Sequence, residues 1–290
     1  MTHFTAGGPK TAAPEHLDVF GKLRVLFCGV SIPRSTNARN PKDFGMPFET
    51  VQLQEKQQIA LELWVIVPAE TKGTVLLLPG YATPKDSLLP AARIFNQLGY
   101  TCVLLDFRGT GGSAGMSTSI GFHEADDVRR AAQYIVERKF MAPLVLYAGS
   151  MGAAAALRAI SIGQLSPAGL ILECPFDRLS TTVKHRFRAM ELPSFPLANL
   201  LLFWGGVHMG FNAFAHNPAS YAKAIRCPVL LMHGEKDPRV TVDEVTRVYD
   251  AIPERKQIKL FPGLAHEIYV TACPEEWKQG VENFLKTLGN

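Results

Sequence analysis

The chain has 290 residues, of which 47% are hydrophobic and 19% charged, and its formal net charge is +4. A chain of this length and composition can bury one large core, so we expect a single α/β domain after a short lead-in. The weak, dispersed positive charge favours no nucleic-acid partner, because its densest cluster, at 184–188, is interpreted as a solvated helix face.

The first 45 residues are interpreted as a lead-in segment, and residues 46–290 as the α/β domain. A short apolar stretch at 25–30 is much shorter than the ~20 residues needed to span a bilayer, and no basic n-region precedes it. It predicts a surface helix packed on the domain and no integral membrane segment. Attachment at the membrane interface is the alternative.

Eight strands are expected in the domain. The first two, at 48–53 and 59–67, predict an antiparallel pair. The other six are continuous apolar runs without alternation, which are typical of a parallel sheet covered on both faces. These runs lie at 74–78, 102–106, 144–147, 169–173, 229–233 and 258–261.

Helical segments alternate with these strands. Two helices are expected at 87–98 and 124–138, from apolar residues at helical spacing and from terminating residues. A third begins at the Thr-x-x-Glu capping box at 241–244 and ends before Pro253. The last lies at the C-terminus and has one apolar face, formed by Trp277, Val281, Phe284 and Leu288. Strand–helix alternation predicts right-handed crossovers and a functional site at the carboxyl ends of the strands.

The five cysteines lie far apart, at positions 28, 102, 174, 227 and 273, and none forms a C-x-x-C pair. Several fall within apolar runs, where a free cysteine packs as a small hydrophobic side chain. Reduced thiols are typical of a cytoplasmic protein, and the cytoplasm is therefore the expected location.

Ser150 is the candidate nucleophile. The run 144–153, LVLYAGSMGA, is an apolar strand that turns abruptly into an alanine-rich helix. A serine on such a sharp, strained turn needs small residues two positions away on each side, and Ala148 and Gly152 meet this need. The alternative is a small-residue turn that contains an incidental serine.

Asp237 and His266 are the candidate acid and base. Each follows directly on an expected strand, and the chain order Ser, Asp, His is the order expected of α/β-hydrolases. His233 is a rival base, interpreted as structural because it ends a strand. Asp177, after the strand that follows the nucleophile, is kept as a rival acid.

Three further segments carry a resemblance to a known family. The sequences LLLPGY at 76–81, LLDFRGTGGS at 104–113 and CPVLLMHGEKD at 227–237 are similar to α/β-hydrolase motifs. From about Phe48 to its end, the chain resembles this superfamily, and within it the single-domain bacterial serine esterases and acylglycerol lipases.

The resemblance implies an α/β-hydrolase fold: a mostly parallel eight-stranded sheet with helices on both faces and a small helical cap, about 177–216, after the sixth strand. The cap segment is very apolar. We expect Phe203, Trp204 and Met209 to bind substrate in an acyl slot. The alternative is that these residues only pack the cap onto the core.

The expected activity is cofactor-free hydrolysis of a small-molecule carboxylic ester through a Ser–His–Asp triad and an acyl-enzyme intermediate. The backbone N–H groups of Tyr81 and Met151 are the expected oxyanion hole. No metal is expected, because no H-E-x-x-H or similar ligand spacing occurs. The oligomeric state is left open.

Alternatives remain within and beyond this class. A thioesterase, a peptidase or a perhydrolase can use the same triad, and a non-catalytic binding protein can share the fold. The segment 109–114 loosely matches the dinucleotide fingerprint G-x-G-x-x-G/A, but it does not lead directly from a strand into a helix.

Overall fold

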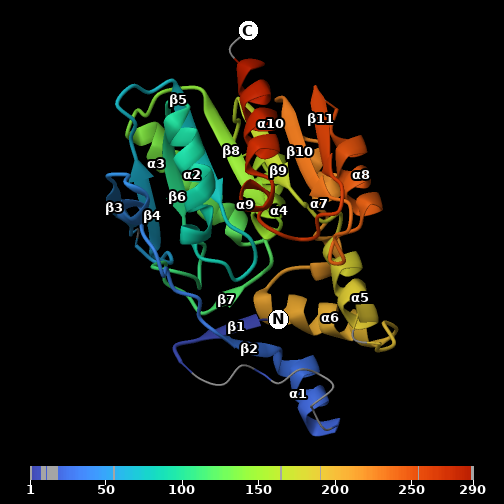
Figure 1. Cartoon of the computed structure of the whole chain (residues 1–290). Coiled ribbons are helices and arrows are strands. Elements are labelled where there is room, and N and C mark those ends of the chain that lie inside the picture. The colour runs from blue at the N-terminus through green and yellow to red at the C-terminus, as the bar shows by residue number, and fades with distance from the viewer. Residues whose placement is uncertain are drawn as a thin grey trace.

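A computed structural model describes residues 2–7, 11, 19–54, 56–163, 165–189, 191–253 and 255–288. At its centre lies one eight-stranded sheet with the order β11–β10–β9–β8–β5–β6–β4–β3 (Figure 1). Its strands are β3 (Glu49–Leu53), β4 (Leu61–Ile66), β5 (Gly73–Leu78), β6 (Tyr100–Leu105), β8 (Leu144–Gly149), β9 (Gly169–Glu173), β10 (Val229–Gly234) and β11 (Lys256–Phe261). All eight strands predicted from the sequence are present, and the mostly parallel α/β-hydrolase sheet is confirmed.

The strands from β11 to β6 are parallel, whereas β4 is antiparallel to both of its neighbours, β3 and β6. Within β4, Leu63 and Val65 belong to one hydrophobic core cluster, and Trp64 and Ile66 belong to the other. Successive side chains of a strand point to opposite faces, so a sheet covered on both faces needs apolar residues at every position.

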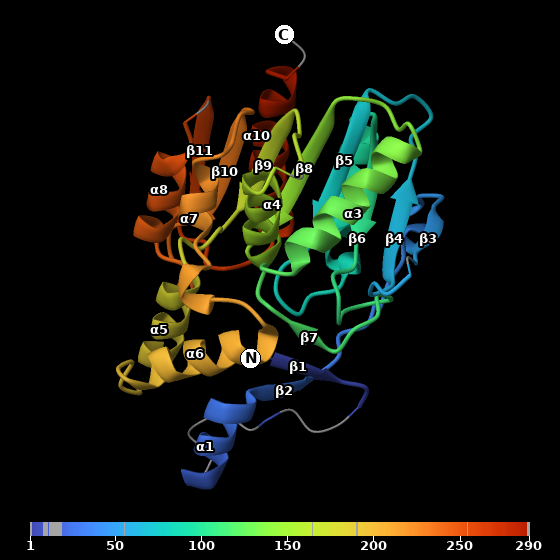
Figure 2. The same cartoon turned by 180° about the vertical axis from the view of Figure 1, so that it is seen from behind.

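Helices cover both faces of the sheet. On one face lie α2 (Leu89–Gln97), α9 (Tyr269–Ala272) and α10 (Pro274–Lys286), with the 3-10 turn η3 (Lys85–Leu88) before α2 (Figure 1). On the other face lie α3 (Glu124–Glu137), α4 (Met151–Ser161), α7 (Pro218–Ala222) and α8 (Val242–Ala251) (Figure 2). The capping box predicted for α8 is confirmed. The Thr241 side chain accepts a hydrogen bond from the Glu244 backbone N–H, and the Glu244 side chain accepts one from the Thr241 backbone N–H.

A second, three-stranded sheet lies below the carboxyl ends of the central strands. It consists of β1 (Thr2–Thr5), which pairs with β2 (Val30–Pro33) in parallel and with β7 (Ser117–Thr118) antiparallel. These strands were not predicted from the sequence. Between β1 and β2 lies α1 (Val19–Cys28), at the position where a surface helix was expected, and η2 (Pro41–Phe44) precedes the central sheet.

An insertion between β9 and α7 lies at the same end of the molecule. It contains α5 (Leu179–Ala189), α6 (Leu197–Met209) and the 3-10 turn η4 (Ala213–Ala215). Helix α6 packs against both α5 and α1, so the insertion and the N-terminal segment adjoin each other (Figures 1 and 2). In the part of the chain that the structure describes, no helix combines the length and the apolar character needed to cross a bilayer.

The core on the α10 side predicts a large effect for Phe95→Ala. The Phe95 ring is fully buried, with ring centroids 5.6 Å from Tyr147 and 5.7 Å from Trp277. Truncation removes these contacts and leaves a cavity, so the free energy of unfolding should fall by about 3–5 kcal/mol. Denaturant unfolding measures the loss. The control, Val136→Ala at an exposed position of α3, should change it little.

Candidate active site

Ser150 lies at the sharp turn between β8 and α4. Its backbone has φ 49° and ψ −109°, a left-handed conformation that strains any residue with a side chain. The Ser150 N–H donates to the Glu173 carbonyl oxygen at 2.8 Å, which ties the turn to β9. A Cβ atom at Gly152 would lie 2.6 Å from the Pro79 carbonyl oxygen, so this position requires glycine.

Asp237 and His266 are brought together from the loops after β10 and β11. His266 Nδ1 and Asp237 Oδ2 are 2.6 Å apart, and the other oxygen, Oδ1, accepts from the backbone N–H groups of Arg239 and Val240. Burial opposes ionisation of Asp237, but these hydrogen bonds outweigh it, so its pKa lies below the usual value. Asp237 is therefore a buried carboxylate oriented toward His266.

One cavity of about 300 Å³ joins the predicted catalytic elements. Ser150, His266, Tyr81 and Met151 all line it, and Asp237 lies behind His266. Met151 begins α4, where backbone N–H groups lack partners within the helix. Between the described Ser150 and His266 side chains the structure has no hydrogen bond; such contacts often tighten only when substrate binds.

The rival acid and base have other contacts. Asp177 Oδ2 accepts from Arg247 Nε at 2.8 Å and lies 3.6 Å from Arg178 Nε. His233 is fully buried with both ring nitrogens unpartnered, and its Nδ1 is 4.0 Å from Asp237 Oδ2. Burial lowers the pKa of His233 below its usual value. Neither Asp177 nor His233 lines the cavity, although both are described.

The three residues expected to bind substrate do not line this cavity. The Trp204 ring packs edge-on against Phe27 of α1 at 5.6 Å, the Phe203 side chain is 52% exposed, and the Met209 carbonyl oxygen is 2.7 Å from His123 Nε2. These three residues do not line the cavity because α6 packs on the protein through Ala198, Leu202 and Gly206. Its other side chains face α1 or solvent.

Helix α5 supplies the cavity residues of the insertion instead. Thr182, His185 and Arg186 line the cavity, and the Arg186 guanidinium lies 5.2 Å from the centre of the Tyr81 ring. These residues were not predicted as part of the site, because the basic run at 184–188 has the composition of a solvated face. The apolar lining of the cavity comes from several loops and strand ends, with Leu88, Ile120, Phe176, Val240 and Ile268 among the residues.

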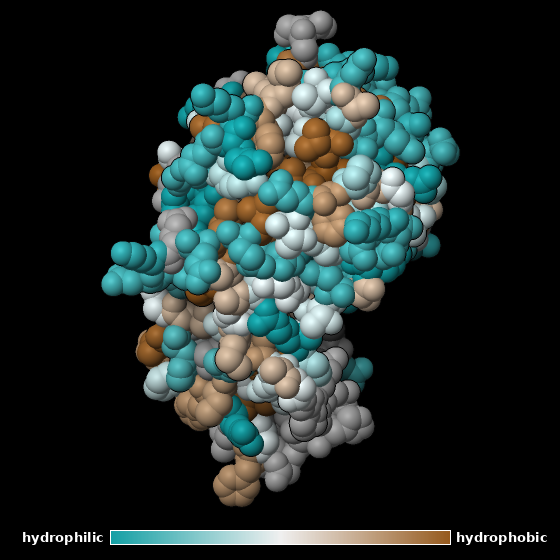
Figure 3. Space-filling view, turned by 90° about the vertical axis from the view of Figure 1, so that its left-hand side faces the viewer, coloured by the Kyte–Doolittle hydropathy of each residue, from teal (hydrophilic) through white to brown (hydrophobic). Residues whose placement is uncertain are grey.

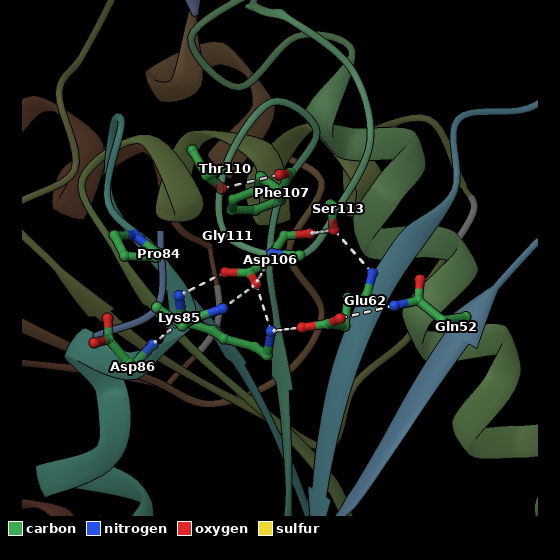
Figure 4. A network of polar contacts seen from close by, with 12 residues as sticks. Gln52, Glu62, Pro84, Lys85, Asp86, Asp106, Phe107, Thr110, Gly111 and Ser113 are labelled. Atoms are coloured by element: carbon green, nitrogen blue, oxygen red, sulfur yellow. Dashed lines mark hydrogen bonds and ion pairs between the residues drawn. The ribbon is translucent and has the colours of Figure 1, made fainter. Parts of the chain in front are cut away.

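A buried polar network fixes the two loops beside Tyr81 (Figure 4). Lys85 is fully buried, and its Nζ contacts Asp106 Oδ2 and, at 2.7 Å, Glu62 Oε1. Asp106 also accepts from the backbone N–H groups of Lys85 and Gly112 at 2.7 and 2.8 Å. The network ties the end of the Tyr81 loop, where η3 begins, to the loop after β6, and loss of one partner would leave a buried charge uncompensated.

This network also explains the glycines at 109–114. A Cβ atom at Gly111 would clash with the Asp106 carboxylate, and one at Gly112 would clash with Glu62. Gly109 leaves room in the same way for the buried Phe4 ring. These glycines therefore serve close packing of the loop against Asp106, Glu62 and Phe4.

Cys174 adjoins the Asp237–His266 pair. Ligand atoms of Cys174, Asp237 and His266 lie within 4.8 Å of one another. A metal needs the thiolate, but burial and the nearby Glu173 and Asp237 raise the pKa of the Cys174 thiol well above its usual value. The hydrogen bond between His266 Nδ1 and Asp237 Oδ2, at 2.6 Å, already engages two of the three donor atoms with each other.

The comparisons with known proteins agree with this geometry. The family model described as serine aminopeptidase, S33 (Hydrolase_4) matches residues 69–202 and 207–271, more than half of the chain. The chain therefore belongs to this family of the α/β-hydrolase superfamily and is a serine hydrolase.

Similar proteins come from bacteria, archaea and vertebrates. The uncharacterized protein YqkD of Bacillus subtilis is 26% identical over 228 residues, 78% of this chain and 75% of that protein. The lysophosphatidylserine lipase ABHD12 of Danio rerio is 25% identical over 260 residues, 79% of this chain and 65% of that protein. The structure of the Pyrococcus furiosus esterase Pf2001 has the same fold, with a TM-score of 0.72 at 24% identity over 88% of this chain and 96% of that one.

Because Glu173 is a buried carboxyl group, we expect the free energy of unfolding to depend on pH. Its Oε1 accepts from Trp277 Nε1 at 2.6 Å, and burial raises its pKa to about 7 from an ordinary 4.5. The native state therefore holds this proton to higher pH than the unfolded state does. The contribution of Glu173 to the free energy of unfolding is therefore fully present below about pH 4.5. It is lost as the pH rises through about 7, and the total loss is about 3 kcal/mol.

Glu173→Gln tests this, because glutamine keeps the acceptor oxygen and cannot ionise. Relative to wild type, the variant should gain about 3 kcal/mol in the free energy of unfolding between pH 4.5 and pH 8. Guanidinium unfolding at both pH values measures the difference, with the exposed Glu276→Gln as control. An equal difference at the two pH values would contradict a raised pKa for Glu173.

Proposed function

We propose that this serine hydrolase cleaves carboxylic esters without a cofactor, through Ser150, His266 and Asp237. The observation that carries the proposal is that the strained Ser150 turn and the Asp237–His266 hydrogen bond meet at one cavity. Three elements far apart in the sequence each supply the chemical group that nucleophilic acyl transfer needs at that position.

Each residue has one role in the proposed reaction. The Ser150 oxygen attacks the acyl carbonyl carbon while His266 accepts the hydroxyl proton, and His266 then protonates the leaving alcohol. Water, deprotonated by His266, hydrolyses the acyl-enzyme. Asp237 holds the imidazole in the required tautomer and stabilises the imidazolium. The backbone N–H groups of Met151 and Tyr81 stabilise the negative charge that develops on the carbonyl oxygen.

The cavity supports an acyl ester with an apolar chain. Its apolar residues, such as Phe176 and Val240, suit an acyl group. The name of the Danio rerio relative, lysophosphatidylserine lipase, supports a lipid ester as the substrate class. The Tyr81 hydroxyl is 2.6 Å from Thr2 Oγ1, so we assign that side chain to anchoring its loop and not to the substrate.

A peptidase on the same triad is the second candidate, because the matching family is described as serine aminopeptidase. A matched ester and amide of the same acyl group distinguish the two. We also propose a cytoplasmic location, which the five cysteines support because none of them, all within the described residues, forms a disulfide.

The nucleophile is tested with a matched serine. Ser150→Ala should lower kcat for p-nitrophenyl esters by about 10⁴-fold or more, because no other group can form the acyl-enzyme. Ser87→Ala is the control, since Ser87 lines the same cavity but donates its hydroxyl to the Pro84 carbonyl oxygen at 2.8 Å. Equal activity of the two variants would remove Ser150 from the mechanism.

The acid is tested with a matched aspartate. Asp237→Asn should lower kcat by about 10⁴-fold through the wrong imidazole tautomer, as in other triads. Asp177→Asn should lower the unfolding temperature with kcat nearly unchanged, because Asp177 pairs with Arg247 outside the cavity. An inactive Asp177→Asn beside an active Asp237→Asn would assign the acid to Asp177.

A further inference from the structure

Helix α6 is largely apolar around its circumference, with Asn199 and His208 as its polar side chains, although it is only half buried. Ala198, Leu202 and Gly206 form its buried face, at a spacing of four residues. Leu200, Phe203 and Val207 form an exposed stripe, and Val207 is 57% exposed. A helix that is hydrophobic all round belongs in a core or in lipid, so the exposed stripe is unusual for a surface helix in water.

Helix α1 extends this apolar surface. Phe20 and Phe27 are seven residues apart on one side of α1, and the Phe20 side chain is 80% exposed. Phe27 contacts the Trp204 ring, which in turn contacts Phe203 at 5.3 Å between centroids. We call the five residues Phe20, Phe27, Leu200, Phe203 and Val207 the apolar end surface. Tan residues are prominent around α1 at the lower end of the molecule in Figure 3.

Basic residues outnumber acidic ones in the two segments that carry the apolar end surface. Residues 19–34 and 177–216 contain two acidic residues, Asp177 and Glu191, against seven basic ones, whereas the whole chain has 26 acidic and 30 basic residues. Asp177 pairs with Arg178 and with Arg247. The basic residues are Lys22, Arg24, Arg34, Arg178, Lys184, Arg186 and Arg188. Arg24 lies between Phe20 and Phe27 on the same side of α1, and Lys184 and Arg188 are exposed on α5.

We propose that this end of the protein docks onto the surface of an anionic lipid bilayer, with the apolar end surface inserted among the headgroups. Exposed aromatic and aliphatic side chains beside basic ones are the combination that binds such an interface. A second copy of the chain fits less well, because a two-fold contact through this face would bring the same basic clusters together.

The docking orientation places the cavity near the lipid. Helix α5, which packs on α6, also lines the cavity through Thr182, His185 and Arg186. A lipid ester could then pass from the bilayer to Ser150 over a short distance. This link to a lipid substrate rests on the proposed function, whereas the docking itself does not.

Vesicle flotation with the full chain tests the proposal. The probes are vesicles of phosphatidylcholine alone and of phosphatidylcholine with about 30 mol% phosphatidylglycerol. Phe20→Ser/Phe203→Ser should weaken binding to the anionic vesicles about tenfold or more, since it removes two inserted side chains. The control is Val136→Ser, which is 70% exposed. Its helix, α3, covers the central sheet and does not belong to the end of the molecule that α1 and α6 form (Figure 1).

The charge is tested separately. Lys184→Gln/Arg188→Gln should weaken binding to anionic vesicles about fivefold or more for each charge removed. The control is Lys278→Gln/Lys286→Gln on α10, which lies at the opposite end of the molecule and should change the binding little (Figure 1). Circular dichroism verifies that each variant is folded. Equal binding by the apolar end surface variant and its control, or no binding of wild type to anionic vesicles, would overturn the proposal.

Two more readouts distinguish lipid docking from self-association and from catalysis. Light scattering without lipid measures whether the wild-type protein is a dimer. The proposal would be overturned if the wild-type protein formed a dimer that Phe20→Ser/Phe203→Ser dissociates, and if the wild-type protein also failed to bind vesicles. Ser150→Ala should bind vesicles as wild type does, so docking and hydrolysis fail independently. Hydrolysis of a water-soluble acetyl ester should be unchanged in Phe20→Ser/Phe203→Ser, because neither residue lines the cavity.

Discussion

Ser150 holds backbone angles of φ 49° and ψ −109°, a conformation that costs of order 1–3 kcal/mol wherever a side chain is present. The surrounding sheet makes this conformation stable: the Ser150 N–H bonds to the Glu173 carbonyl oxygen, and Gly152 packs against the carbonyl oxygens of Leu78 and Pro79. The turn thus depends on β5 and β9 as well as on its own strand, β8. It is the constraint that places a serine hydroxyl at the carboxyl ends of the strands.

The loops that carry Asp237, His266 and Tyr81 are positioned around that turn by the sheet and by buried polar contacts. The sheet aligns the loops that carry Asp237 and His266, and their 2.6 Å hydrogen bond fixes the imidazole. The buried contacts of Lys85 with Asp106 and Glu62 hold the loop of Tyr81. The chemistry is therefore supported by rigid sheet and network, whereas α5, α6 and α1 form the outer end of the molecule, which we assign to substrate access and lipid contact.

The sequence predicted the central sheet well, because a strand buried on both faces is a continuous apolar run. It did not predict β1, β2 and β7, since strands of two to four residues carry too little pattern. Phe203, Trp204 and Met209 were expected to bind substrate, but they do not line the cavity. Because α6 is largely apolar around its circumference, periodicity cannot say which face looks inward. The run at 184–188 was interpreted as a solvated face, which describes the exposed Lys184 and Arg188, while Arg186 also lines the cavity.

The central claim is that Ser150 is the activated nucleophile of a Ser–His–Asp triad. Mass spectrometry of the native protein after reaction with a fluorophosphonate tests it most directly, because the reagent forms a covalent adduct only with an activated serine. We expect one adduct per chain, located on Ser150 by peptide sequencing, and almost none when His266 is replaced by alanine. An adduct on another residue, or no adduct on the folded wild-type protein, would contradict the account.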